Sequence, residues 1–135
     1  MMSKISLNPS TLFDSRQYGF SQIVVAQGSR TVYWSGQVAW DENEQIVGEN
    51  DLRAQVWQAL ENVKTAVSAA GGSLDDVVAL RIYILHDWMD KTAPVSAGLK
   101  AFFPGDHPPA TTWIGVQSLA RPEFLIEIEG TAVLE

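Results

Sequence analysis

The spacing of apolar residues predicts a long amphipathic helix over residues 51–70. Large aliphatic side chains recur there every three or four positions, which is the period of a helix with one buried face. Asn50 or Asp51 can cap its N-terminus, because short polar side chains accept hydrogen bonds from the first free N–H groups. Gly71-Gly72 predicts a left-handed C-cap. This helix is therefore expected to pack against the core.

A second, shorter helix is predicted over residues 94–103. Pro94 suits the first turn of a helix, where its missing N–H costs nothing. Leu99, Phe102 and Phe103 then supply an apolar face. The stretch between Pro104 and Pro109 is expected to be a loop.

Alternation of side-chain types predicts five strands. They are residues 21–25, 31–37, 77–85, 111–116 and 124–134, which are rich in β-branched and aromatic residues. Only a break at Gly28-Ser29 separates the first two, so we expect them to form a hairpin. The predicted order is β-β-α-β-α-β-β, an α+β fold in a single domain over residues 1–135. One sheet would carry two helices on one face.

The predicted sheet has sizeable residues on both faces. Glu127 and Glu129 alternate with isoleucines and so share one face of the last strand. Tyr33 and Trp34 likewise point to opposite faces. Two helices can cover only one face. Self-association would cover the other, and an ordinary solvated face is the alternative.

The overall charge disfavours several partners. The chain has 135 residues, 46% of them hydrophobic, which is enough for a real core, and a formal net charge of −7. Its nine basic residues are scattered, whereas phosphate binding needs clustered Lys and Arg. We therefore expect no nucleic-acid partner and no binding to an anionic membrane surface.

Neither cysteine chemistry nor a metal site is indicated. The chain has no cysteine, and its two histidines, His86 and His107, lack the spacing of metal ligands. We expect no metal and no cofactor. Residues 1–10 do not read as a signal peptide, and no stretch approaches a membrane span. The expected location is the cytoplasm.

Several short motifs, in this order, make the chain resemble the Rid (YjgF-type) family from about Tyr18 to Val133. They are Ser21-Gln22, Ser35-Gly36-Gln37, the helix that ends at Ala69-Ala70-Gly71, Asp76-Val77-Val78, Phe102-Phe103, Pro109-Ala110 and Ile126-Glu127-Ile128-Glu129. The resemblance implies a chorismate-mutase-like α+β fold that forms a homotrimer. It also implies small-molecule sites in the clefts between subunits, and hydrolysis of reactive imines or enamines, that is, deamination.

The resemblance also assigns site residues. It implies that Glu127 is the catalytic acidic residue, while Gly36 belongs to the Ser-Gly-Gln signature beside the ligand. In active deaminases of the family an arginine that binds the substrate carboxylate follows Pro-Ala; here that position is Thr111. Phe20 stands where the family has a pocket tyrosine, and Ser96 where it has an asparagine. Trp113 is expected to be pocket wall or interface packing.

Three functional readings remain open. The chain could hydrolyse an imine whose substrate lacks a carboxylate, or Arg81 or Arg121 could replace the missing arginine. It could also be a non-catalytic trimer that binds a small metabolite or has a regulatory role. Threonine offers one neutral hydrogen bond, and loss of a charge-assisted pair costs on the order of 1.5–3 kcal/mol.

Each candidate residue has a plainer explanation as well. Glu127 could be a structural carboxylate at a subunit contact, and Arg81 a surface charge paired across the sheet. Arg121 could lie in an exposed turn, and Thr111 could simply be a good strand former. Some members of the family are called endoribonucleases, but the acidic balance of this chain argues against RNA as a substrate.

Overall fold

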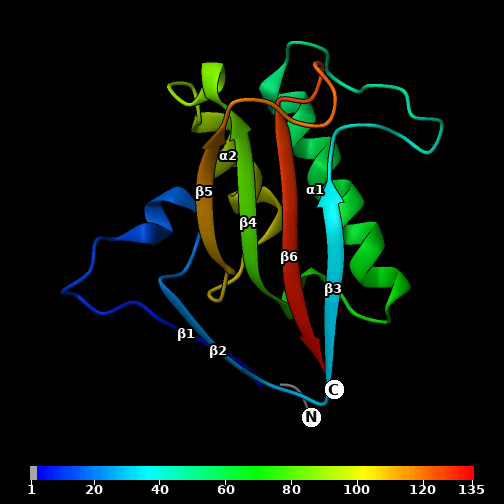
Figure 1. Ribbon diagram of the computed structural model, residues 1–135. Helices are drawn as coiled ribbons and strands as arrows, with labels where there is room; N and C mark the ends of the chain where they lie inside the picture. The colour runs from blue at the N-terminus through cyan, green and yellow to red at the C-terminus, as the bar shows by residue number, and fades with distance from the viewer. Residues whose placement is uncertain (1–2) are drawn as a thin grey trace.

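The computed structural model describes residues 3–135 and shows a mixed α+β fold around a four-stranded sheet (Figure 1). The strand order is β3-β6-β4-β5, and only the β4–β5 pair is parallel. The bounds of these strands are Arg30–Gln37 for β3, Val77–Leu85 for β4, Ala110–Val116 for β5 and Ile126–Leu134 for β6. The edge strands are therefore β3 and β5, and β6 and β4 lie in the centre.

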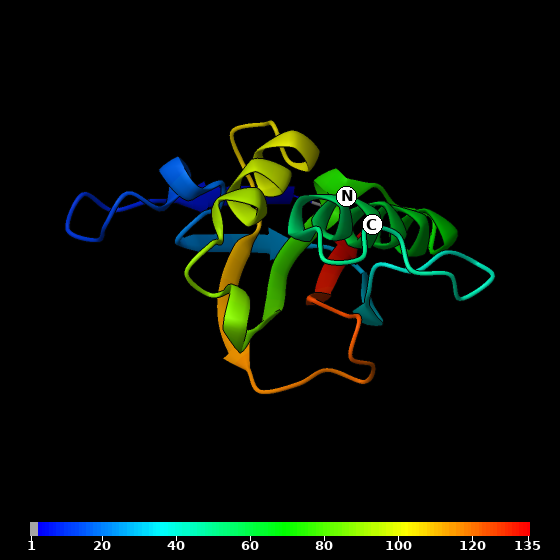
Figure 2. The same cartoon turned by 90° about the horizontal axis from the view of Figure 1, so that it is seen from above.

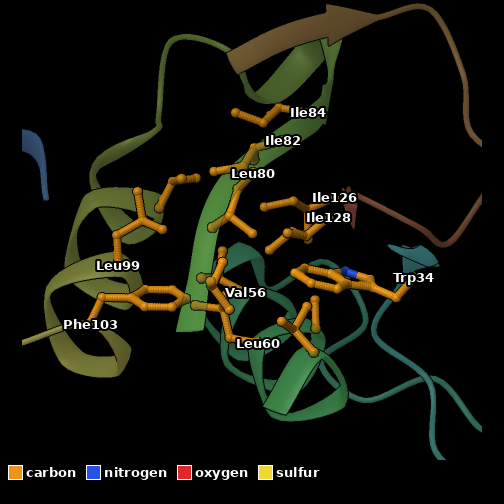
Figure 3. Close-up of a cluster of buried hydrophobic side chains, with 14 of the residues drawn as sticks. Trp34, Val56, Leu60, Leu80, Ile82, Ile84, Leu99, Phe103, Ile126 and Ile128 are labelled. Carbon is orange, nitrogen blue, oxygen red and sulfur yellow. The ribbon is translucent and has the colours of Figure 1, made fainter. Parts of the chain in front are cut away.

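Two helices, α1 (Leu52–Ala69) and α2 (Ala93–Phe102), cover one face of this sheet (Figure 2). Their apolar stripes meet isoleucines and leucines from β4 and β6, and these side chains form the core (Figure 3). Gly98 of α2 lies against Val56 of α1, where an added methyl group would overlap that side chain. The α+β fold class and the placement of both helices on one face are thus confirmed.

Helix α1 begins and ends where its sequence indicated. The Asp51 carboxylate accepts a hydrogen bond from the backbone N–H of Ala54 at 3.1 Å, so Asp51 is the N-cap. Gly71 has φ +92°, and the N–H of Gly72 reaches back to the carbonyl of Val67 at 3.0 Å. This is the Schellman arrangement, which favours glycine because side chains rarely adopt positive φ.

The predicted hairpin of the first two strands is wrong. Strand β2 (Ile23–Gln27) pairs with β1 (Ser3–Leu7), a strand that was not predicted, and β3 pairs with β6 instead. At the turn between β2 and β3, the N–H of Ser29 donates a hydrogen bond to the carbonyl of Leu134. This bond places the start of β3 beside the end of β6. The apolar residues of β1 are exposed, so no buried apolar stripe marked this segment as a strand.

The face of the four-stranded sheet opposite the helices, called the open face here, carries the polar side chains of the strands. Direct cross-strand partners share a face, and the register pairs Arg81 with Glu129 and Tyr83 with Glu127. Tyr33 also points to this face and is 79% exposed. Within residues 3–135, no element of the chain covers this face as α1 and α2 cover the other.

Candidate functional site

Glu127 lies on the open face, with its carboxyl group over the backbone of Gly36. A methyl group added to Gly36 would overlap the end of the Glu127 side chain, so glycine at this position leaves room for the carboxyl group. The β3–β6 register slips between Trp34 and Gln37, and this bulge brings Gly36 beside Glu127. The Ser-Gly-Gln signature and the acidic residue, distant in sequence, are thus in contact.

The pKa of Glu127 is raised above its usual value. Partial burial is the main cause, because it disfavours the charged form, and the nearby charge of Glu129 adds to it. A carboxyl group with a raised pKa can hold a proton and exchange it closer to neutral pH than an ordinary glutamate can. This is the property that acid–base chemistry at Glu127 would need.

Tyr83 links the two glutamates. It stands opposite Glu127 in the β4–β6 register, but its hydroxyl group donates a short hydrogen bond to the Glu129 carboxylate. This bond raises the pKa of Tyr83, an effect that Arg81 partly counteracts. Tyr83 therefore stays protonated and remains a donor. Gly36, Tyr83, Glu127 and Glu129 are called the carboxylate cluster below.

A second group of candidate residues lies at the edge strand β5, on the other side of the sheet. Thr111 and Trp113 are the register partners of Leu80 and Ile82, which face the helices, so both point to the helical face. The indole N–H of Trp113 donates to the Thr111 hydroxyl at 3.0 Å. The ring of Phe20 packs against that of Trp113, with 6.0 Å between centroids.

Helix α2 brings Ser96 to the same side of β5. The backbone at Gly19, next to Phe20, approaches α2 so closely that an added methyl group would crowd Leu99 and the Ser96 carbonyl. Gly19 has φ +95°, which lets the chain turn toward β2 here. Phe20, Thr111 and Trp113 are called the aromatic cluster below. Ser96 lies near it on α2, where its carbonyl faces Gly19.

The structure therefore separates the predicted site residues into two groups within one chain. The carboxylate cluster lies on the open face at β6 and β3, and the aromatic cluster lies on the helical face beside β5. Strand β4 lies between β6 and β5 in the sheet. One subunit alone does not bring Glu127 together with Thr111.

The two arginines proposed as substitutes for the missing one lie in different places. Arg81 is on the open face, opposite Glu129. Arg121 stacks over the ring of Trp40 at 5.4 Å and is exposed, so it lies outside both clusters.

Sequence reasoning overlooked one buried polar residue that fixes this region. Gln55 of α1 is fully buried, and its side chain bonds the carbonyls of Gly48 (3.1 Å) and Glu123 (2.9 Å) and the N–H of Leu125 (2.9 Å). It thereby ties α1 to the segment that enters β6 two residues before Glu127. A glutamine on the apolar stripe of a helix was the signal that could have revealed it.

Within residues 3–135, no group of three or more metal-binding side chains comes together. Neither α1 nor α2, nor any other helix there, combines the length and the apolar character of a membrane span.

The chain matches known proteins along most of its length. The family model described as Endoribonuclease L-PSP matches residues 15–134. Among solved structures, the Rid-family protein YyfB of Yersinia pestis is 44% identical, with a TM-score of 0.92 over 97% of this chain and 98% of that one. RidA of a Psychrobacter species is 31% identical, with a TM-score of 0.70 over 85% and 88% of the two chains.

A ligand-bound relative shares the same fold. TdcF of E. coli, solved with bound serine, is 29% identical, with a TM-score of 0.69 over 78% of this chain and 81% of that one. Together, the extent of the family match and the sequence identity to YyfB establish the family of this chain. The chain belongs to the Endoribonuclease L-PSP family, which includes the Rid proteins.

Proposed function

We propose that this protein is an imine or enamine hydrolase that works as a homotrimer, with each site formed between two subunits. The observation that carries this proposal is the Glu127 carboxyl group, partly buried over Gly36, with a raised pKa. A proton-exchanging group is what hydrolysis of a C=N bond requires from a protein. Membership of a family that includes Rid proteins supports the same chemistry.

Glu127 can serve both proton transfers of the reaction. As an acid it would protonate the imine nitrogen, which makes the carbon more electrophilic. As a carboxylate it would then take a proton from the water that attacks this carbon. The same group would next protonate the amine of the resulting carbinolamine and recover the hydroxyl proton as ammonia leaves and the carbonyl forms. One water molecule is consumed, and no other reactant is needed.

A site between subunits follows from the separation of the two clusters. In one chain they lie on opposite faces of the sheet, with β4 between their strands. In the closed trimer that we propose, each subunit would present its open face to one neighbour and its β5 edge to the other. The carboxylate cluster of one subunit and the aromatic cluster of the next would then enclose one ligand. Serine bound to TdcF shows that a relative of this fold takes a small amino acid.

Complementation between two inactive variants tests this assembly. We expect Glu127→Gln and the double variant Phe20→Ala/Trp113→Ala each to release ammonia at least roughly 100-fold more slowly than wild type when assayed alone. After the two are unfolded together and refolded as mixed trimers, roughly a quarter of the sites should combine two intact clusters and regain activity. Light scattering should report a trimer in every sample. A site contained within one chain would give no recovery, and an active double variant or a stable monomer would also contradict the proposal.

The aromatic cluster favours substrates without a carboxylate. The Thr111 hydroxyl already accepts a hydrogen bond from the Trp113 indole N–H. The ring of Phe20 packs beside the Trp113 ring and adds further apolar surface. No cation belongs to this cluster. We therefore infer altered substrate choice, toward neutral or apolar imines, compared with relatives that carry an arginine at this position.

Thr111→Arg should extend activity to imines that carry a carboxylate. A paired arginine–carboxylate contact contributes about 1.5–3 kcal/mol, so kcat/KM for a 2-iminopropionate-type substrate should rise roughly 10- to 100-fold. Ammonia release from freshly generated imines measures this effect. Thr112→Arg is the matched control, because Thr112 pairs with Arg81 and points to the open face. A folded Thr111→Arg variant that gains no activity would show that the missing arginine is not the sole determinant.

A non-catalytic, ligand-binding or regulatory trimer is the second candidate. The observation that favours it is Thr111 itself, whose hydroxyl offers far less binding energy than an arginine. Ammonia release from imines with and without a carboxylate separates the two functions. If neither wild type nor Glu127→Gln releases ammonia from any imine, the enzyme proposal fails and the binding function remains.

Cleavage of RNA is the function that the family description names, and we do not propose it for this chain. The formal net charge is −7, and phosphate binding would require clustered cations. Retention on RNA at physiological salt would contradict this view. Hydrolysis of small metabolites also agrees with the cytoplasmic location that we expect.

A further inference from the structure

Glu129 occupies a fixed position beside Glu127. The two residues are two positions apart on β6 and therefore share the open face. Two adjacent carboxylates repel each other, and free side chains would turn apart. Here the Tyr83 hydroxyl holds Glu129 by a hydrogen bond, and the ring of Tyr83 rises from the position directly opposite Glu127. Tyr83 thus spans both glutamates from the neighbouring strand.

The two glutamates have different surroundings. The hydroxyl of Tyr83 donates a hydrogen bond to the Glu129 carboxylate, which fixes the position of that carboxylate. Glu127 is partly buried over Gly36, and no hydrogen bond to its carboxyl group is seen in residues 3–135. Burial and the neighbouring negative charge both raise the pKa of Glu127.

We propose that Tyr83 and Glu129 are positioning residues for Glu127: Tyr83 fixes the Glu129 carboxylate on the same face as Glu127, where its negative charge makes Glu127 easier to protonate. The inference rests on the proposed function, because it explains how Glu127 would be ready to act as an acid. Tyr83 and Glu129 take no part in the proton transfers themselves. They act only through Glu127.

Few other charges lie on this face. Besides Tyr83 and the two glutamates, the ionisable residues on this face of β3, β4 and β6, within residues 3–135, are Tyr33 and Arg81. Arg81 stands opposite Glu129, although no ion pair within 4 Å joins them in the described part of the chain. A cavity of about 340 Å³ lined by Tyr33, Arg81 and Glu129 opens on this face. Among the described residues of these three strands, Glu129 is thus the only other carboxylate on the face of Glu127.

The test is a titration of the glutamate side-chain carboxyl groups by carbon-detected NMR, performed on the assembled protein. Glu129→Gln removes the fixed charge, so the titration midpoint of Glu127 should fall toward that of an ordinary glutamate. Tyr83→Phe leaves the charge but frees the side chain. The midpoint of Glu127 should then fall, but by less than in Glu129→Gln.

Tyr33→Phe is the matched control, since it removes from the same face a tyrosine hydroxyl that makes no hydrogen bond to Glu129 within residues 3–135. It should leave the Glu127 midpoint unchanged. The inference is overturned if the Glu127 midpoint is the same in wild type and Glu129→Gln, or if Tyr33→Phe shifts it as much as Tyr83→Phe does. The readout needs no turnover, so it stands even if no imine is hydrolysed. Where ammonia release is measurable, the pH profile of kcat/KM should shift in the same direction as the midpoint.

Discussion

Glu127→Gln is expected to lower kcat for ammonia release about 100- to 10,000-fold, the range typical for loss of a general acid–base group. The amide has nearly the same shape as the carboxyl group, but it cannot give up and take back a proton at neutral pH. The fold should be kept, because a neutral side chain avoids the desolvation that raises the pKa of Glu127. Steady-state ammonia release and circular dichroism, measured on the same sample, check both expectations.

Two further variants separate the role of Glu127 from general damage. Glu61→Gln changes an exposed glutamate of α1 and should leave the rate unchanged. Gly36→Ala keeps the carboxyl group but displaces it, because the added methyl group overlaps only the flexible end of Glu127. We expect this variant to fold and to lose most of its activity. Full activity in Glu127→Gln would rule out Glu127 as the general acid.

Gln55→Leu is expected to destabilise the protein by roughly 3 kcal/mol or more. Leucine fits the apolar neighbours of α1 but removes three hydrogen bonds, to Gly48, Glu123 and Leu125. Each buried polar group left without a partner costs about 1–3 kcal/mol. Urea unfolding measures the change, and it is done at a fixed protein concentration because the proposed trimer would make the stability depend on concentration.

The loss of Gln55 should also affect the site. The N–H of Leu125 is bonded by Gln55 just before β6 begins, and Glu127 follows two residues later. Ammonia release should therefore fall below the level that the folded fraction alone would give. Gln117→Leu, in an exposed loop, is the control and should change the free energy of unfolding by less than about 0.5 kcal/mol. Equal stability of the two variants would refute a structural role of Gln55.

Local patterns in the sequence predicted most of the helices and strands, because helix capping and strand alternation involve residues that are near one another in the chain. The caps of α1 lie next to the residues they satisfy, so Asp51 and Gly71 could be identified without the tertiary structure. The alternation in β6 likewise placed Glu127 and Glu129 on one face. The partner of β2 could not be predicted in this way, because hydrogen-bond pairing between strands carries little local signature when one strand has no buried stripe.

The sequence by itself thus determined the α+β class, the two helices, the family resemblance and the identity of the candidate residues, including threonine at position 111. Only the tertiary structure decided which of them meet. The register of β4 against β6 brought Tyr83 to the two glutamates, and the bulge in β3 brought Gly36 under Glu127. The register of β5 against β4 put Thr111 on the opposite face of the sheet from Glu127, and the strand order put β4 between them. The physical reason is that alternation within one strand fixes only which of its residues share a face, whereas strand order and the pairing of particular residues depend on backbone hydrogen bonds between distant segments.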